Sequence, residues 1–119
     1  MRFLIAVLMV AGTLGLATAG EATVEAVDAR QASDGTWRFD VTVRHADTGW
    51  DHYANAFTIE MMDGTPLGTR TLHHPHVEEQ PFTRSLSGVA IPDGVDKVLV
   101  RAVDSVHGPG DAVTFTLER

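Results

Sequence analysis

Hydrophobic and polar side chains alternate with a period of two from about residue 21 onward, which is the spacing of a strand with one buried face. The segment TWRFDVTVRH is the clearest case, because Trp37, Phe39, Val41 and Val43 would share one face and polar side chains the other. No part of this region keeps the 3.6-residue period of an amphipathic helix. The pattern therefore predicts an all-β protein.

Turn sequences divide the region into about seven predicted strands, near residues 22–31, 36–46, 55–62, 67–73, 82–91, 95–104 and 112–118. SDGT at 33–36, MDGTP at 62–66 and IPDG at 91–94 each contain Asp-Gly, which supplies the left-handed backbone angles of tight hairpins. The strand at 82–91 changes phase around Gly88, which predicts a bulge. Strands of this number and spacing indicate an immunoglobulin-like or fibronectin-III-like antiparallel β-sandwich. A small open barrel is the alternative.

The first residues have the composition of a secretory signal. Arg2 precedes an apolar run that ends in Ala17-Thr18-Ala19, the small-residue pattern of a signal peptidase site. We expect residues 1–19 to be cleaved, leaving residues 20–119 as one domain in the periplasm or outside the cell, without a membrane segment. An uncleaved membrane anchor is the alternative.

Composition narrows the classes of partner and chemistry. The chain has no cysteine and a net charge of −7, which loss of Arg2 would make about −8. A basic patch for nucleic acid is not visible in the sequence, and an acidic protein favours cationic ligands. No G-x-S-x-G elbow is present, and Glu78-Glu79 would point in opposite directions on an extended chain. We therefore expect a protein that is not an enzyme.

All six histidines fall in one set of predicted connections. Because connections between successive antiparallel strands alternate between two ends, the three Asp-Gly turns should share one end of the sandwich. Residues 46–54, 73–81 and 105–110 should then share the other end. That end would carry every histidine of the chain, namely His45, His52, His73, His74, His76 and His107.

These histidines are candidate ligands for a divalent transition metal, because imidazole suits Cu(II) and Zn(II) and carboxylates can complete the shell. His74-Pro75-His76 would hold two rings near each other on an extended loop. The predicted metal ligands are His74, His76, His107, His52 and Asp104. Alternatively, the histidines hydrogen-bond within their own fold and rigidify the loops.

Aromatic side chains in the same loops favour a second interpretation. Trp50 and Tyr53 lie in the polar segment HADTGWDHYAN, as on many recognition surfaces. Further predicted binding residues around them are His45, His73, Glu78 and Arg84. In this interpretation the loops contact an envelope protein and no metal is needed. A structural alternative is that Trp50 folds back and closes the core.

The segments VTVRHADTGWDHYANAF, LGTRTLHHPHVEEQPFTRSLSGVAIP and RAVDSVHG resemble a family of small exported bacterial proteins without an assigned activity. That resemblance implies export and one compact domain. In its closing pattern of Asp104, His107, Gly110 and Phe115 the chain is also similar, to a lesser degree, to periplasmic copper-resistance sandwiches of the CopC type. This second resemblance implies a Cu(II) site made by histidine and aspartate.

Overall fold

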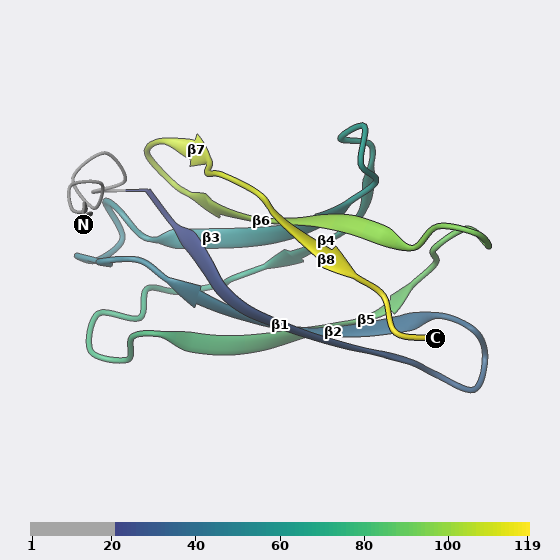
Figure 1. Ribbon diagram of the computed structural model, residues 1–119. Helices are drawn as coiled ribbons and strands as arrows, with labels where there is room; N and C mark the ends of the chain where they lie inside the picture. Colours follow the sequence, from purple (N-terminus) through teal and green to yellow (C-terminus); the bar gives the residue numbers. More distant parts are fainter. Residues whose placement is uncertain (1–20) are drawn as a thin grey trace, which may run out of the picture.

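The computed structural model describes residues 21–119, so the predicted signal peptide at 1–19 lies outside the described residues. The described chain contains strands and no helix, and its strands form two antiparallel sheets that make a sandwich (Figure 1). The strands are β1 (Thr23–Gln31), β2 (Trp37–Arg44), β3 (Ala54–Glu60), β4 (Pro66–Thr71), β5 (Phe82–Val89), β6 (Lys97–Asp104), β7 (Gly108–Pro109) and β8 (Val113–Thr116). The sequence prediction of an immunoglobulin-like or fibronectin-III-like sandwich is confirmed at this level.

One sheet has three strands in the order β1-β2-β5, and the other has the order β4-β3-β6-β7, with β8 also paired to β6. Neighbouring strands in sequence therefore cross between sheets, as from β2 to β3 and from β5 to β6. The connections alternate between two ends of the sandwich (Figure 1). We call the end that carries residues 45–53, 72–81 and 105–112 the histidine end, because all six histidines lie there.

The core lies between the sheets and is built by the side chains that the period-two pattern points inward. The four inward residues of β2 are completely buried, as are Phe57 and Ile59 from β3 and Val98 and Val100 from β6. Burying a side chain of this size contributes about 1.5–3 kcal/mol in transfer free energy. Met61, which continues the inward parity of β3, lies beyond the end of that strand and is partly exposed.

The predicted Asp-Gly turns have the left-handed backbone angles that the sequence indicates. Gly35, Gly64 and Gly94 of the Asp-Gly turns all have positive φ. The pairing of β2 with β5 shifts register between Trp37 and Phe39, opposite Gly88, which also has positive φ. The predicted bulge in β5 is thereby confirmed.

One short strand was not expected from the sequence. After β6, the chain turns at residues 105–107 and returns as β7, where Gly108 pairs with Asp104 and Pro109 with Val103. Two residues are too few to show a hydrophobic period, so the sequence pattern could not predict this strand. The tight hairpin holds His107 next to the end of β6.

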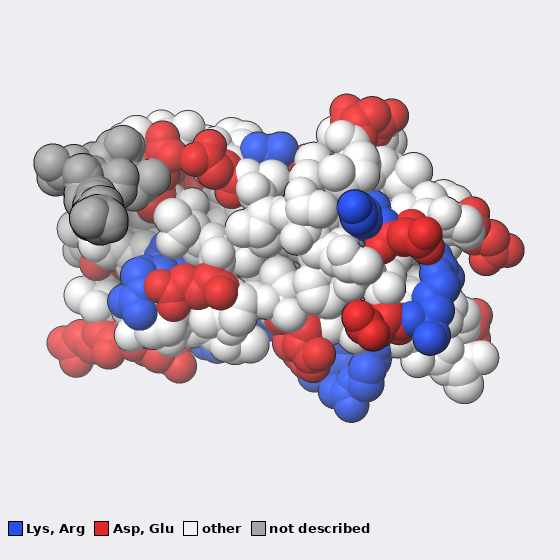
Figure 2. Space-filling model, in the orientation of Figure 1, with Lys and Arg blue, Asp and Glu red and all other residues white. Residues whose placement is uncertain are grey.

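Charged side chains of both signs lie beside one another on the face shown in Figure 2, where basic groups do not form a continuous patch. Ion pairs among the described residues include Arg38 with Asp40 and Arg101 with Glu60. Within residues 21–119, no helix is long and apolar enough to cross a bilayer.

Candidate metal centre

Two short backbone structures position the side chains of the histidine end. Residues 48–52 form a tight turn in which Thr48 N donates to His52 O at 3.0 Å and His52 N to Gly49 O at 3.2 Å. The turn after β6 is attached to this segment, because Ser105 N donates to Tyr53 O at 2.9 Å. These bonds place His52 opposite the end of β6, where Asp104 lies.

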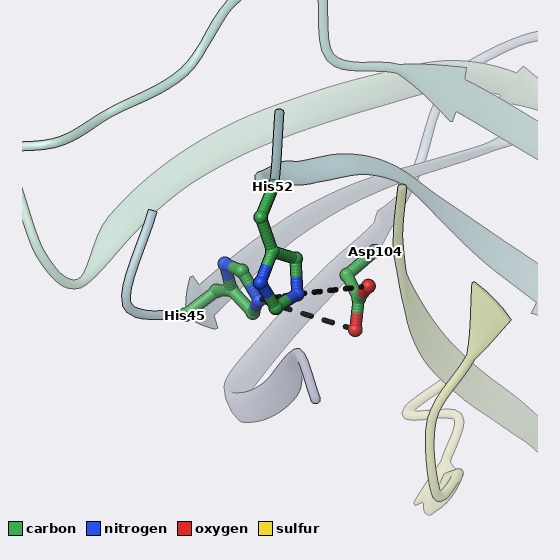
Figure 3. Close-up of side chains that lie close together, drawn as sticks. All are labelled: His45, His52 and Asp104. Carbon is green, nitrogen blue, oxygen red and sulfur yellow. Dashed lines mark hydrogen bonds and ion pairs between the residues drawn. The ribbon is translucent and has the colours of Figure 1, made fainter. Parts of the chain in front are cut away.

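His45, His52 and Asp104 form a compact group (Figure 3). The Nε2 atoms of the two rings are 3.2 Å apart, His52 Nε2 is 3.2 Å from Asp104 Oδ1, and His45 Nε2 is 3.9 Å from Asp104 Oδ2. In Figure 3 both rings are directed toward the carboxylate. One donor atom from each residue lies within 4.8 Å of the other two. Within residues 21–119, these are the three metal-ligating side chains whose donor atoms come this close together.

Asp47 contacts Nδ1 of His45, on the side of the ring away from His52 and Asp104, and so determines which ring nitrogen faces the group. Its Oδ1 accepts the Nδ1–H of His45 at 2.5 Å and the backbone N–H of Ala54 at 3.1 Å, and its Oδ2 accepts the N–H of His76 at 2.6 Å. Because the proton of the neutral His45 ring is held at Nδ1, the lone pair of Nε2 is directed at His52 and Asp104. In protein metal sites, a ligating histidine commonly donates its other ring N–H to a carboxylate.

Asp104 is a buried carboxylate that its surroundings keep ionised. Burial alone would raise its pKa, but the N–H groups of His107 and Val106 and the ring of His107 outweigh this, so the pKa lies below its usual value. Oδ1 accepts both backbone bonds, at 2.6 Å from His107 N and 2.8 Å from Val106 N. The buried group therefore carries at least one negative charge beside two imidazoles.

The separation of the donor atoms fits a transition-metal ion. Bonds of about 2.0–2.1 Å in tetrahedral geometry place neighbouring ligand atoms about 3.3 Å apart. The Nε2–Nε2 separation and the His52 Nε2–Asp104 Oδ1 separation, both 3.2 Å, match that value. His45 Nε2 is 3.9 Å from the other carboxylate oxygen, Oδ2, so a shared ion would require the carboxylate or the His45 ring to shift. Two imidazoles and a carboxylate, with no thiolate, suit Zn(II) and Cu(II), and the same donor set also binds Fe(II).

His76 forms a different arrangement on the neighbouring loop. Its ring stacks on Phe82 with centroids 4.0 Å apart, and Arg84 Nη2 donates to its Nε2 at 3.0 Å. The ring proton is therefore on Nδ1, which is buried without a hydrogen-bond partner among the described residues. Burial first, then the charges of Arg84 and His74, lower the pKa of His76. With Nε2 accepting from Arg84, this ring is not prepared for metal binding.

Gln80 joins this loop to the candidate site. Its side-chain oxygen accepts the N–H of His45 at 2.9 Å, and its side-chain nitrogen donates to His76 O at 2.9 Å. The peptide bond that follows, between Gln80 and Pro81, is cis. Together with Asp47, Gln80 fixes the backbone on which His45 stands.

The structure brings together some of the residues that the sequence singled out. His52 and Asp104 are in the group of three, His45 joins them, and His107 contacts Asp104 Oδ2 through Nδ1 at 3.2 Å. His74 and His76 instead form a pair of their own, with ring centroids 4.7 Å apart. His73 and Glu78 are exposed, and Arg84 reaches Glu79 at 3.5 Å.

The residue patterns discussed above do not single out Asp47. A sequence signal for it exists, because the alternation of buried and exposed residues in β2 continues past the strand through His45 to Asp47.

Trp50 does not close the core. It sits at the tip of the 48–52 turn, 67% exposed, with its ring against Tyr53 in a T-shaped contact at 5.6 Å between centroids. Val77 and Val106 are also exposed, by 54% and 58%. Each of the three connections of the histidine end thus presents one large apolar side chain to solvent.

Comparison with known proteins gives one informative relative. A protein of Halomicrobium mukohataei that bears the name "Putative lipoprotein" is 40% identical over 90 residues, which make up 76% of this chain. These residues are 44% of the relative, so the chain spans less than half of that protein. No family model matches the chain, and no solved structure matches it. The likeness to copper-resistance sandwiches therefore rests on the residue pattern alone.

Proposed function

We propose that this chain is an exported, non-enzymatic binding protein that holds one divalent transition-metal ion, Zn(II) or Cu(II), between His45, His52 and Asp104. The observation that supports this most strongly is the geometry of the donors. Two Nε2 atoms and a carboxylate oxygen converge from two different segments at separations close to those of a coordinated ion.

The electrostatics of the group favour a cation. Asp47 and Asp104 have fully buried side chains, and the ion pairs observed for them in residues 21–119 are all with histidines. Buried carboxylates are costly unless they are paired or coordinate a metal. A divalent ion would neutralise this charge directly.

Export is supported by two independent features. The first is the amino-terminal sequence, with its apolar run and Ala17-Thr18-Ala19. The second is the relative, whose name describes a lipoprotein. In an exported protein without cysteine, histidine and carboxylate are the remaining strong metal-binding side chains.

The direct test is calorimetric titration of the purified protein with Zn(II) and with Cu(II). We expect one ion per chain, bound more tightly than the same ion binds a hexahistidine peptide. His52→Ala should abolish this binding, because it removes one of the three ligands. The variant should still fold, since the ring is partly exposed and is not part of the core. His73→Ala is the matched control, since it removes an exposed histidine of the same end. Equal binding by both variants would refute the proposed site.

A second candidate function, contact with an envelope protein, is supported by the exposure of Trp50, Val77 and Val106. Photo-crosslinking in cells from position 50, compared with position 34 at the opposite end, would test it. A discrete adduct from position 50 alone is expected. Equal or absent adducts at the two positions would refute it.

A further inference from the structure

The side chains around the candidate metal centre are graded in exposure. His45 and Asp104 are completely buried, His52 is 22% exposed, and His107 is 42% exposed. His107 contacts two of the three ligands, with its Nδ1 3.2 Å from Asp104 Oδ2 and its ring centroid 5.0 Å from that of His52. It therefore stands on the solvent side of the group.

From this arrangement we propose that His107 is an exchangeable fourth ligand, through which the metal ion enters the site and is passed to an incoming ligand. This inference rests on the proposed function, because it concerns the same metal ion. It adds a role in metal transfer, in which the acceptor offers nitrogen or oxygen donors.

The backbone of His107 is held by two contacts, while its partly exposed ring is held through Nδ1 by Asp104. Its N–H is bound to Asp104 Oδ1, and the next residue pairs with Asp104 in the β6–β7 hairpin. The ring is outside the group whose donor atoms all lie within 4.8 Å of one another. Coordination therefore requires a rotation of a partly exposed ring, which gives up its Nδ1 contact with Asp104 Oδ2 but leaves the backbone in place.

His45 and Asp104 cannot swing away from the ion in this way. His45 is held from behind by Asp47 and Asp104 is bonded to two backbone N–H groups, so release of either would break buried hydrogen bonds. An acceptor that approaches from solvent meets His107 first. Replacement of His107 by one donor of the acceptor keeps the ion coordinated throughout the exchange, and the displaced ring returns to Asp104.

The experiment is a transfer assay with Zn(II)-loaded protein and the chromogenic chelator 4-(2-pyridylazo)resorcinol. For the wild-type protein, the rate of transfer should rise in proportion to chelator concentration. His107→Ala should accelerate transfer by at least about tenfold and weaken equilibrium binding by a similar factor, which corresponds to about 1.4 kcal/mol. His73→Ala should change neither quantity.

A spectroscopic experiment distinguishes metal ligation by His107 from a purely structural role of this residue. The visible spectrum of the Co(II)-loaded protein should change in His107→Ala and stay unchanged in His73→Ala. Identical spectra, affinities and transfer rates for His107→Ala and the wild-type protein would overturn the inference while leaving the three-residue site intact. Absence of metal binding by the wild-type protein would instead refute the proposed function itself.

Discussion

His45 Nδ1 and Asp47 Oδ1 lie 2.5 Å apart, and both side chains are completely buried. The contact fixes the tautomer of His45 and turns its other nitrogen toward His52 and Asp104. The same carboxylate accepts the N–H groups of Ala54 and His76, so it joins the 45–53 connection to the first residue of β3 and to the 72–81 connection.

Replacement of Asp47 by asparagine should weaken metal binding. The amide cannot accept from all three donors, because its NH2 group would face an N–H group in place of an oxygen. We expect Asp47→Asn to lower Zn(II) affinity by about 10–100-fold and to cost about 1–3 kcal/mol in the free energy of unfolding. Competition titration with a chelator and urea unfolding measure the two effects. Asp51→Asn, in the same loop but exposed, is the control, and equal affinities for the two variants would contradict this role.

His76 should make the stability of the protein depend on pH. Its pKa is lowered in the folded protein, first by burial and then by Arg84, so the unfolded chain binds a proton more readily. The free energy of unfolding should therefore fall as the pH drops below the ordinary histidine value of 6.5, with a slope of at most about 1.4 kcal/mol per pH unit from this group.

The variant His76→Phe keeps a ring stacked on Phe82 and removes the titrating group. Urea unfolding between pH 5 and 8 compares the two proteins. As the pH falls below 6.5, the free energy of unfolding of the variant should rise relative to that of the wild-type protein, by at most about 1.4 kcal/mol per pH unit. His73→Phe, at an exposed position, should follow the wild-type curve. Parallel curves for His76→Phe and the wild-type protein would show that His76 has no such role.

Gly110 allows the start of β1 to pack against the β6–β8 region. A Cβ atom at this position would lie 2.5 Å from the backbone oxygen of Ala22, and this oxygen cannot move as a flexible side chain would. We expect Gly110→Ala to lower the free energy of unfolding by about 1–3 kcal/mol. Gly68→Ala should cost less, because its Cβ would meet side-chain atoms and no backbone, with Leu86 at 3.1 Å and Val89 at 3.5 Å. Thermal unfolding of both variants checks the order.

The two tryptophans should differ sharply in their contribution to stability. Trp37 is completely buried, and Trp37→Ala should cost about 3–5 kcal/mol. Trp50→Ala removes only an exposed ring and its contact with Tyr53, so we expect a loss of about 1 kcal/mol or less. Urea unfolding of the two variants measures both values, and a large loss for Trp50→Ala would mean that this ring supports the core after all.

The sandwich could be predicted because its strands are half-buried and its turns contain Asp-Gly. Period-two alternation identified the inward residues of β2, and Gly88 identified the bulge in β5. The short strand β7 carries too few residues for any pattern. Its formation depends on Asp104 bonding to the turn that follows, which is a contact between side chain and backbone.

The site could be predicted only to the level of one end of the fold. Alternating connections placed all six histidines together, but they do not say which rings meet. The 48–52 turn directs His52 toward Asp104, while Phe82 and Arg84 hold the ring of His76 elsewhere. These directions depend on loop hydrogen bonds and stacking between segments distant in sequence, which hydrophobic periodicity does not encode.

Anomalous diffraction from crystals of the Zn(II)-loaded protein, recorded above and below the zinc edge, tests the central proposal most directly. We expect one peak about 2.0–2.1 Å from His45 Nε2, His52 Nε2 and an oxygen of Asp104. A peak beside His74 and His76, or no peak within bonding distance of His45 and Asp104, would contradict the proposed site.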